Sequence, residues 1–112
     1  MLFRSRPQPA LLHALRAKPR GIVICPSNPF ISIEPILAVP GLRDAIKASG
    51  APVVAVSPII AGKAVKGPTA RMFEALGVTP SAAAVAARYG DLLDGYVLET
   101  GDDAEGIAQR VF

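Results

Sequence analysis

Three short apolar segments recur along the chain and predict β-strands. They cover residues 21–25 (GIVIC), 52–56 (PVVAV) and 95–99 (GYVLE). β-Branched residues are frequent in them, and apolar positions do not alternate with polar ones. Strands that are buried on both faces, as in parallel sheets, have this composition. We therefore expect three buried strands, with Cys25 as a small buried residue at the end of the first.

Helical patterns occupy the segments before and between the first two strands. The first helix is expected from Pro9 to Ala17. After the first strand, Ser32 is the expected N-cap of a second helix, because a serine hydroxyl can accept a hydrogen bond from the first helical turn. Pro40-Gly41 interrupts this pattern and predicts a break before a third helical segment over residues 42–48.

The second strand leads into a long loop over residues 57–67, and further helices are expected beyond it. Proline is favoured at the first position of a helix, so Pro68 and Pro80 are expected to open helices over residues 70–76 and 82–89. Asp102 or Asp103 is the expected cap of a last helix that runs to the C-terminus.

Strands that alternate with helices predict right-handed crossovers and a parallel sheet. The expected fold class is therefore α/β, a Rossmann-like parallel sheet with flanking helices. A length of 112 residues suits one small domain, which we place at residues 21–112 after a basic segment and helix at residues 1–20. Three strands leave open edges, and the chain is expected to stop in a helix. Both points predict an incomplete sheet, a fragment of a larger domain.

The basic character of the chain is confined to its N-terminal segment. Five basic and no acidic residues precede Glu34, whereas seven basic and nine acidic residues occupy positions 34–112. Aromatic residues make up only 5% of the sequence, so a basic face interleaved with aromatic side chains is not expected, and nucleic acid is set aside as a partner. An Arg-rich, acid-free start is also typical of organelle transit peptides, but we favour a surface helix there.

The sequence also argues against several kinds of site and location. No apolar run approaches the roughly 20 residues that a membrane helix needs. We therefore expect no membrane partner, and we expect a cytoplasmic location. Cys25 and His13 are the only cysteine and histidine. One cysteine cannot form an internal disulfide, and one histidine excludes multi-histidine metal sites.

The first candidate site is the loop Pro26-Ser27-Asn28-Pro29, which follows the first strand. In open parallel sheets, ligands bind beyond the carboxyl ends of the strands, where this loop would lie. Two prolines stiffen it, and Ser27 and Asn28 offer a hydroxyl and an amide. The helix N-terminus expected near Ser32 would add free N–H groups that favour an anion such as a diphosphate. A rigid turn capped by Asn28 explains the spacing equally well.

The second candidate site is the loop at residues 57–69, which follows the second strand. Gly62 and Gly67 permit a close approach of the backbone to a ligand. Lys63 and Lys66 would place two ammonium groups near a helix N-terminus, which suits phosphates. Lys66 is followed by glycine and proline rather than Ser or Thr, so this is not a Walker loop. A surface loop with two solvated lysines is the alternative, and the length of the loop favours a functional role.

Two pairs of aspartates flank the third strand. Asp91 and Asp94 precede it and so lie at its amino end, away from the expected ligand edge, where turn and capping roles are favoured over metal binding or acid–base work. Asp102 and Asp103 follow it. Capping of the last helix is the favoured role for this pair, and a contact with Mg²⁺ is the alternative. Metal ligands and catalytic residues are left unassigned.

Three longer segments carry a resemblance to a known family. They are residues 25–41 (CPSNPFISIEPILAVPG), 54–68 (VAVSPIIAGKAVKGP) and 87–95 (ARYGDLLDG). In this order they resemble the 2-phospho-L-lactate transferases of coenzyme F-420 biosynthesis, including the phosphoenolpyruvate variant of actinobacteria. The resemblance extends over residues 18–100, and Glu34 stands where many relatives have glycine.

The resemblance implies a transferase in which a guanosine diphosphate-linked donor passes a 2-phospholactyl or enolpyruvyl phosphate group to a deazaflavin hydroxyl. GMP leaves, and Mg²⁺ is the implied cofactor. Phosphoryl-type transfer depends on charge neutralisation and in-line placement more than on a covalent nucleophile. The residues assigned to these tasks are Ser27, Asn28, Lys63, Lys66 and Gly67 for the nucleotide and its phosphates, and Ser57 and Thr69 for the substrate crevice.

The resemblance also implies that part of the family's chain is not represented here. Family members are longer, and they begin with a glycine-rich strand-to-helix turn followed by an aspartate and an arginine that meet the deazaflavin; nothing before Gly21 matches it. We therefore expect a C-terminal portion that is inactive alone and pairs with a complementing N-terminal half or with a second copy. The alternatives are a non-catalytic nucleotide-binding or structural remnant that needs a partner chain, and a related regulator that binds nucleotide sugars.

Overall fold

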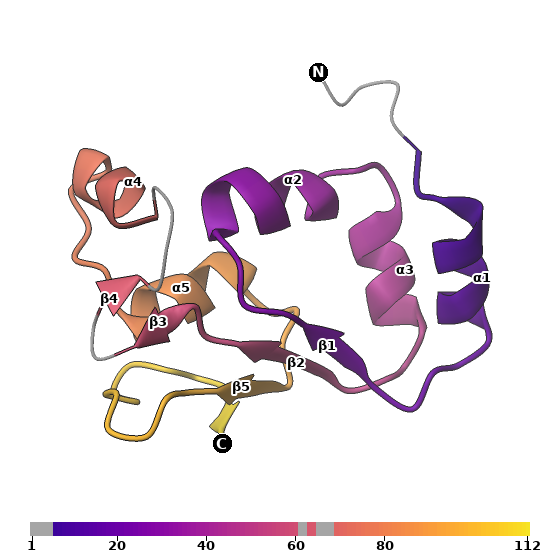
Figure 1. The fold of residues 1–112 in the computed structure, drawn as a ribbon. Helices are drawn as coiled ribbons and strands as arrows, with labels where there is room; N and C mark the ends of the chain where they lie inside the picture. Colours follow the sequence, from indigo (N-terminus) through magenta and orange to yellow (C-terminus); the bar gives the residue numbers. More distant parts are fainter. Residues whose placement is uncertain (1–5, 61–62, 65–68) are drawn as a thin grey trace.

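The computed structural model describes residues 6–60, 63–64 and 69–112, which form an α/β fold (Figure 1). The principal sheet has four strands in the order β1-β2-β5-β6. These strands are β1 (Ile22–Ile24), β2 (Val53–Val56), β5 (Gly95–Val97) and β6 (Arg110–Val111). All neighbouring pairs in this sheet are parallel. The expected α/β class, with a parallel sheet and flanking helices, is confirmed.

Helices precede and connect these strands. α1 (Pro9–Arg16) comes before β1, α2 (Glu34–Leu37) and α3 (Leu42–Ala48) join β1 to β2, and α4 (Thr69–Ala75) and α5 (Ala82–Tyr89) join β2 to β5. The break at Pro40-Gly41 is present, and Gly41 adopts a φ of 85° at the start of α3. Left-handed backbone of this kind favours glycine, which explains why the helical segment restarts after this residue.

One hydrophobic core lies between the helices and one face of the sheet. Val53, Ala55 and Tyr96 enter it from β2 and β5. Further large members come from the helices, namely Leu15 of α1, Leu42 and Ile46 of α3, Phe73 of α4, and Val85 and Tyr89 of α5, and Ile59, Leu92 and Leu93 come from the connecting segments. Full burial of an aliphatic or aromatic side chain stabilises the fold by about 1.5–3 kcal/mol. The core therefore specifies which face of the sheet the helices cover.

Two expectations about the first strand are wrong. Cys25 is exposed rather than buried, and Val23 retains 66% of its accessible surface. β1 is an edge strand of the described sheet, and the core covers only the face that carries Ile22 and Ile24. Residues on the other face of β1 therefore remain in solvent although the strand is wholly apolar.

The helix expected at the C-terminus is also wrong, and the sheet gains a fourth strand in its place. Gly101 and Gly106 adopt φ values of 99° and 82°, which interrupt any helix in this segment. Asp103 accepts a hydrogen bond at its Oδ1 from the Glu105 N–H at 2.8 Å and so stabilises a turn. The chain then enters β6 beside β5.

The segment after β2 is not a simple loop. Ile59–Ile60 (β3) and Lys63–Ala64 (β4) form a two-stranded antiparallel ribbon, with Ile59 opposite Ala64. Ile59 is fully buried, so the core holds the start of this ribbon in place. Pro68, the expected first residue of the following helix, lies outside the described residues.

The start of α5 also differs from the expectation. Ser81 is its N-cap and accepts a hydrogen bond at Oγ from the Ala84 N–H at 3.0 Å, so Pro80 precedes the helix rather than opening it. In the described part of the chain, no helix is long and apolar enough to span a bilayer.

Candidate functional site

The two candidate loops leave the sheet at the same edge. β1 and β2 are parallel neighbours, with Ile24 opposite Ala55, so the segments that follow them emerge side by side. The helices beyond them also meet. Asn28 Nδ2 lies 3.5 Å from Met72 Sδ of α4, and the rings of Phe30 and Phe73 pack edge to face with centroids 4.9 Å apart. The structure therefore joins the first loop to the helix that follows the lysine-containing loop.

Asn28 begins the helical segment after β1. It precedes the π-helical turn η1 (Pro29–Ile33), and its Oδ1 accepts hydrogen bonds from the N–H groups of Phe30 at 2.8 Å and Ile31 at 3.2 Å. The prediction that Ser32 is the N-cap is therefore wrong. Pro29, with φ already restricted to helical values, allows the helical segment to start earlier, and asparagine is among the best capping residues.

This cap changes the interpretation of the first loop. Pro29 has no N–H, Asn28 accepts from the next two N–H groups, and those of Ser32 and Ile33 donate to the Asn28 carbonyl. The N–H groups expected to be free for a diphosphate are therefore satisfied within the turn. The alternative, a rigid turn capped by Asn28, describes the structure. Phosphate binding by Ser27 and Asn28 stays a prediction, and for Asn28 it would require release of the cap.

Ser57 extends the ladder between β2 and β5. Its N–H donates to the Val97 carbonyl at 2.9 Å, and its Oγ accepts from the Ile59 N–H at 3.1 Å. The side chain is nearly buried, with 8% of the residue exposed. These bonds orient the turn from β2 into β3, so Ser57 positions the start of the second candidate loop. A contact between Ser57 and substrate stays a prediction.

A buried tyrosine lies beneath this turn. Tyr96 is fully buried, and its hydroxyl has no partner of good hydrogen-bond geometry among the described residues. Burial raises its pKa, and the nearby Ser57 hydroxyl partly opposes the shift. Burial also raises the pKa of Tyr89, with a further contribution from Tyr96. Both phenols therefore remain neutral at physiological pH.

The lysine-containing loop is described only in part. Lys63 lies in β4, opposite Ile60, and Thr69 begins α4. Lys66 and Gly67 lie outside the described residues. The roles of these four residues in binding phosphate or lining the crevice stay predictions.

A clamp beside the first loop was missed from the sequence. Arg88 of α5 donates through Nε to Glu34 Oε1 at 2.6 Å and through Nη2 to Glu34 Oε2 at 2.9 Å. The guanidinium also lies over the ring of Phe30, 4.9 Å from its centroid. Hydrogen bonding to Glu34 raises the pKa of Arg88 further. The clamp ties η1 and α2 to α5, and no local pattern reveals it because its members are 54 positions apart.

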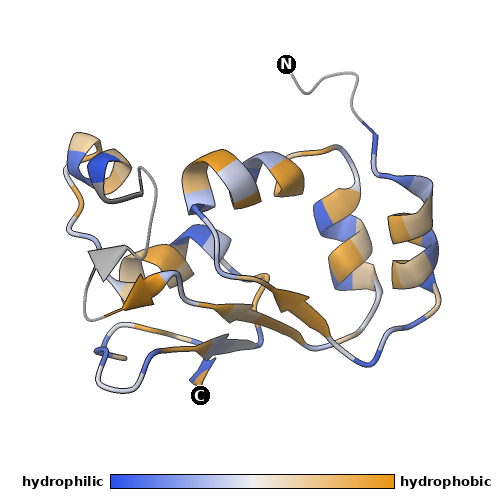
Figure 2. Cartoon of the chain, viewed as in Figure 1, coloured by the Kyte–Doolittle hydropathy of each residue, from blue (hydrophilic) through white to orange (hydrophobic). Residues whose placement is uncertain are grey.

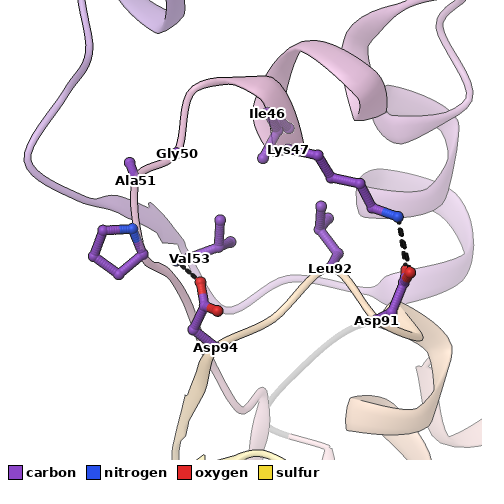
Figure 3. Close-up of a pocket in the computed structure, with 9 residues that line it drawn as sticks. Ile46, Lys47, Gly50, Ala51, Val53, Asp91, Leu92 and Asp94 are labelled. Atoms are coloured by element: carbon purple, nitrogen blue, oxygen red, sulfur yellow. Dashed lines mark hydrogen bonds and ion pairs between the residues drawn. The ribbon is translucent and has the colours of Figure 1, made fainter.

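Asp91 and Asp94 lie at the opposite edge of the sheet, as expected. Asp94 Oδ2 accepts from the Val53 N–H at 2.8 Å, which ties the start of β5 to the start of β2. Asp91 pairs with Lys47 at 2.9 Å and with Arg43 at 3.4 Å, and both cations lower its pKa, Lys47 the more strongly. Lys47, Val53, Asp91 and Asp94 are among the residues that line a cavity of about 470 Å³ between α3 and the strand starts (Figure 3). The expected position of the two aspartates, away from the ligand edge, is confirmed, but their side chains link the turn before β5 to α3 and β2 rather than capping a helix.

Comparison with known proteins assigns the chain to a family. The family model described as 2-phospho-L-lactate transferase CofD matches residues 3–111. The chain belongs to this family. A phosphoenolpyruvate transferase of Kitasatospora aureofaciens is 46% identical over 114 aligned residues, and that of Streptomyces griseus is 46% identical over 100. A phosphoenolpyruvate transferase of Mycobacterium avium is 44% identical over 96 residues.

The alignments with these relatives cover most of this chain but only a minor part of each relative. The alignments include 95%, 88% and 80% of the chain and 35%, 31% and 28% of the three relatives, respectively. The chain therefore spans about a third of the length of the curated relatives it matches. The resemblance in the three sequence segments is confirmed as family membership.

Mg²⁺, the cofactor implied by the family resemblance, stays a prediction. In the ranges that the structure describes, no three Asp, Glu, His or Cys side chains are grouped so that they could hold a metal ion. Mg²⁺ is commonly bound by one or two carboxylates together with substrate phosphates.

Proposed function

We propose that this chain forms the donor-binding edge of a transferase of coenzyme F-420 biosynthesis. One observation carries the proposal: within the family-like segments 25–41 and 54–68, the chain leaves the neighbouring parallel strands β1 and β2 at the same edge of the sheet. Ligands of open parallel sheets bind at that edge. The Asn28–Met72 and Phe30–Phe73 contacts hold the first segment against α4, the helix that comes after the second segment.

The proposed donor is a guanosine diphosphate derivative of phosphoenolpyruvate or 2-phospholactate. The relatives are phosphoenolpyruvate transferases, which favours the enolpyruvyl version. Lys63 and Lys66 would neutralise the diphosphate, with Gly67 allowing close approach, while Ser27 would help to position it. Ser57 and Thr69 would line the adjoining crevice. Mg²⁺ would enter with the diphosphate.

The proposed reaction transfers the phosphorus that carries the enolpyruvyl or lactyl group. The terminal hydroxyl oxygen of a deazaflavin forms a new P–O bond, the P–O bond to GMP breaks, and the hydroxyl proton leaves to solvent. Pre-positioned cations accelerate such transfers because charge on the phosphate oxygens is neutralised at the moment of transfer. Since the relatives are about three times as long, we propose that this chain binds the donor but does not complete the transfer without the rest of the family's polypeptide.

The test is calorimetric titration of the chain with GDP in the presence of Mg²⁺. The double variant Lys63→Ala/Lys66→Ala is expected to weaken binding at least about tenfold, because each hydrogen bond to a charged group contributes about 1.5–3 kcal/mol. Lys18→Ala, which removes an exposed lysine before β1, is the matched control and should bind as the unaltered chain does.

Equal affinity of the double variant and the unaltered chain would refute the assignment of the lysine loop. Tighter binding of UDP-sugars than of GDP would favour the nucleotide-sugar regulator instead. Transfer to a deazaflavin is assayed separately, with the chain alone and with the remaining polypeptide of the Kitasatospora aureofaciens relative added. Transfer by the chain alone would contradict the proposed division of labour.

A further inference from the structure

The face of the sheet opposite the core carries a cluster of valines. Val23 is opposite Val54, and Val56 is opposite Val97, so their side chains are neighbours on the same face. We call Val23, Val54, Val56 and Val97 the valine face. None of the four belongs to the core or to the partly buried residues packed against it, whereas the alternating residues Val53, Ala55 and Tyr96 do.

The described helices leave the valine face uncovered. In Figure 1 the helices lie above and behind the strands, and only the C-terminal segment lies below them. Figure 2 shows that β1 and β2 are among the most hydrophobic parts of the sheet. Val23 is 66% exposed, and the other three valines are half-buried. Parallel sheets are normally covered on both faces, because their strands are apolar on both.

Phe112 covers only one end of this face. A Cβ added to Gly95 would lie 2.8 Å from Phe112 Cε2 and 3.3 Å from Val54 Cγ2, so the phenyl ring rests over the glycine. Phe112 is nevertheless 61% exposed. The guanidinium of Arg110, which is opposite Gly95, lies 5.3 Å from the centroid of the ring. The valine face is therefore bordered by an aromatic ring and a cation.

We propose that the valine face is the docking surface for an amphipathic α-helix from the part of the family's polypeptide that this chain does not span. The Kitasatospora aureofaciens relative is matched over only 35% of its length, which leaves nearly two thirds of that chain to supply such a helix. An aliphatic stripe on the helix would pack on the valines. A carboxylate near one end of the stripe would pair with Arg110.

Charge favours this occupant over a second copy of the chain. In a symmetric dimer, the carboxylate that pairs with Arg110 of one copy would have to come from the valine face of the other copy. Among the residues of the four strands, the valine face contributes no carboxylate. A helix from a different segment has no such restriction. The proposal rests on family membership and not on the transfer reaction.

Co-expression tests this docking surface. The tagged chain is produced together with the unmatched portion of the Kitasatospora aureofaciens relative, and the amount of partner recovered per tagged chain is measured without nucleotide. Val23→Asp should lower recovery at least tenfold, and the nearly isosteric Val23→Thr should lower it several-fold. Ile36→Asp is the matched control, because Ile36 is 53% exposed and belongs to α2, which lies among the helices above the strands (Figure 1), and recovery should stay within twofold.

Circular dichroism verifies that each variant is folded, which is expected because Val23 is solvent-exposed. Failure to recover any partner with the unaltered chain would overturn the proposal, as would equal recovery with Val23→Asp. Light scattering on the chain alone should show a monomer. A dimer that Val23→Asp dissociates would identify a second copy as the occupant and would also overturn it. Nucleotide titration of the chain alone is independent of all these outcomes, so the proposed function can fail separately.

Discussion

The most direct test of the structure is removal of the cap at Asn28. Asn28→Ala deletes the Oδ1 that accepts from the Phe30 and Ile31 N–H groups at 2.8 Å and 3.2 Å. Loss of an N-cap side chain costs about 0.5–2 kcal/mol, and two N–H groups lose their partner here. Because water can reach the Ile31 site in part, we expect the free energy of unfolding to fall by about 1–2 kcal/mol. In a domain of this size that lowers Tm by about 4–8 °C.

The control keeps the acceptor and removes the amide. Asn28→Asp retains an oxygen that can accept both hydrogen bonds, and its negative charge is favourable at a helix N-terminus by a few tenths of a kcal/mol. It loses only the weak contact from Nδ2 to Met72 Sδ. We expect its stability to lie within about 0.5 kcal/mol of the unaltered chain. Urea denaturation followed by circular dichroism measures both variants.

Hydrogen exchange provides the local readout for the same pair of variants. In Asn28→Ala the amide protons of Phe30 and Ile31 should exchange faster, while those of Ala55 in the sheet should respond only through the change in global stability. Unchanged exchange at Phe30 and Ile31, together with a stability change below about 0.3 kcal/mol, would refute the role of Asn28 as the cap. An Asp variant as unstable as the Ala variant would refute the hydrogen-bond explanation.

Two further predictions concern buried phenols and the clamp. Burial raises the pKa values of Tyr89 and Tyr96 above the ordinary 10.0, so stability is complete below that pH and is lost as pH rises past it. Since these are the only tyrosines, tyrosinate absorbance should appear together with the loss of helical circular dichroism as the pH is raised. The double variant Tyr89→Phe/Tyr96→Phe should lose its helical dichroism only at higher pH. Ionisation of the tyrosines near pH 10.0 in a chain that is still folded would contradict this prediction. Glu34→Gln breaks the half-exposed pair with Arg88 and should cost about 0.5–1 kcal/mol in urea denaturation, less in about 1 M salt. Arg88→Lys should cost as much, because lysine cannot reproduce the fork or the stacking on Phe30. A loss that is independent of salt in Glu34→Gln would argue against an ionic clamp.

Part of the candidate site could be predicted from sequence. The sequence predicts the two loops at the carboxyl ends of parallel strands, and the structure adds that these strands, β1 and β2, are neighbours. The capping role of Asn28 was one of two interpretations, and the structure shows it. The Glu34–Arg88 clamp could not be predicted, because it joins positions 54 residues apart that come together only when α5 packs beside η1.

The sequence by itself determined the order of β1, α3, β2, α4, α5 and β5, the break at Pro40-Gly41 and the parallel sheet. Gly41, with its positive φ, acts on neighbouring residues, so its effect can be recognised from a short stretch of chain. Only the tertiary structure decided which apolar residues are buried. Val23 and Cys25 have the composition of a core strand, yet they are exposed because the described helices cover one face of the sheet and β1 lies at its edge. β6 likewise forms because β5 offers it an open edge, a property of the assembled sheet rather than of residues 110–111.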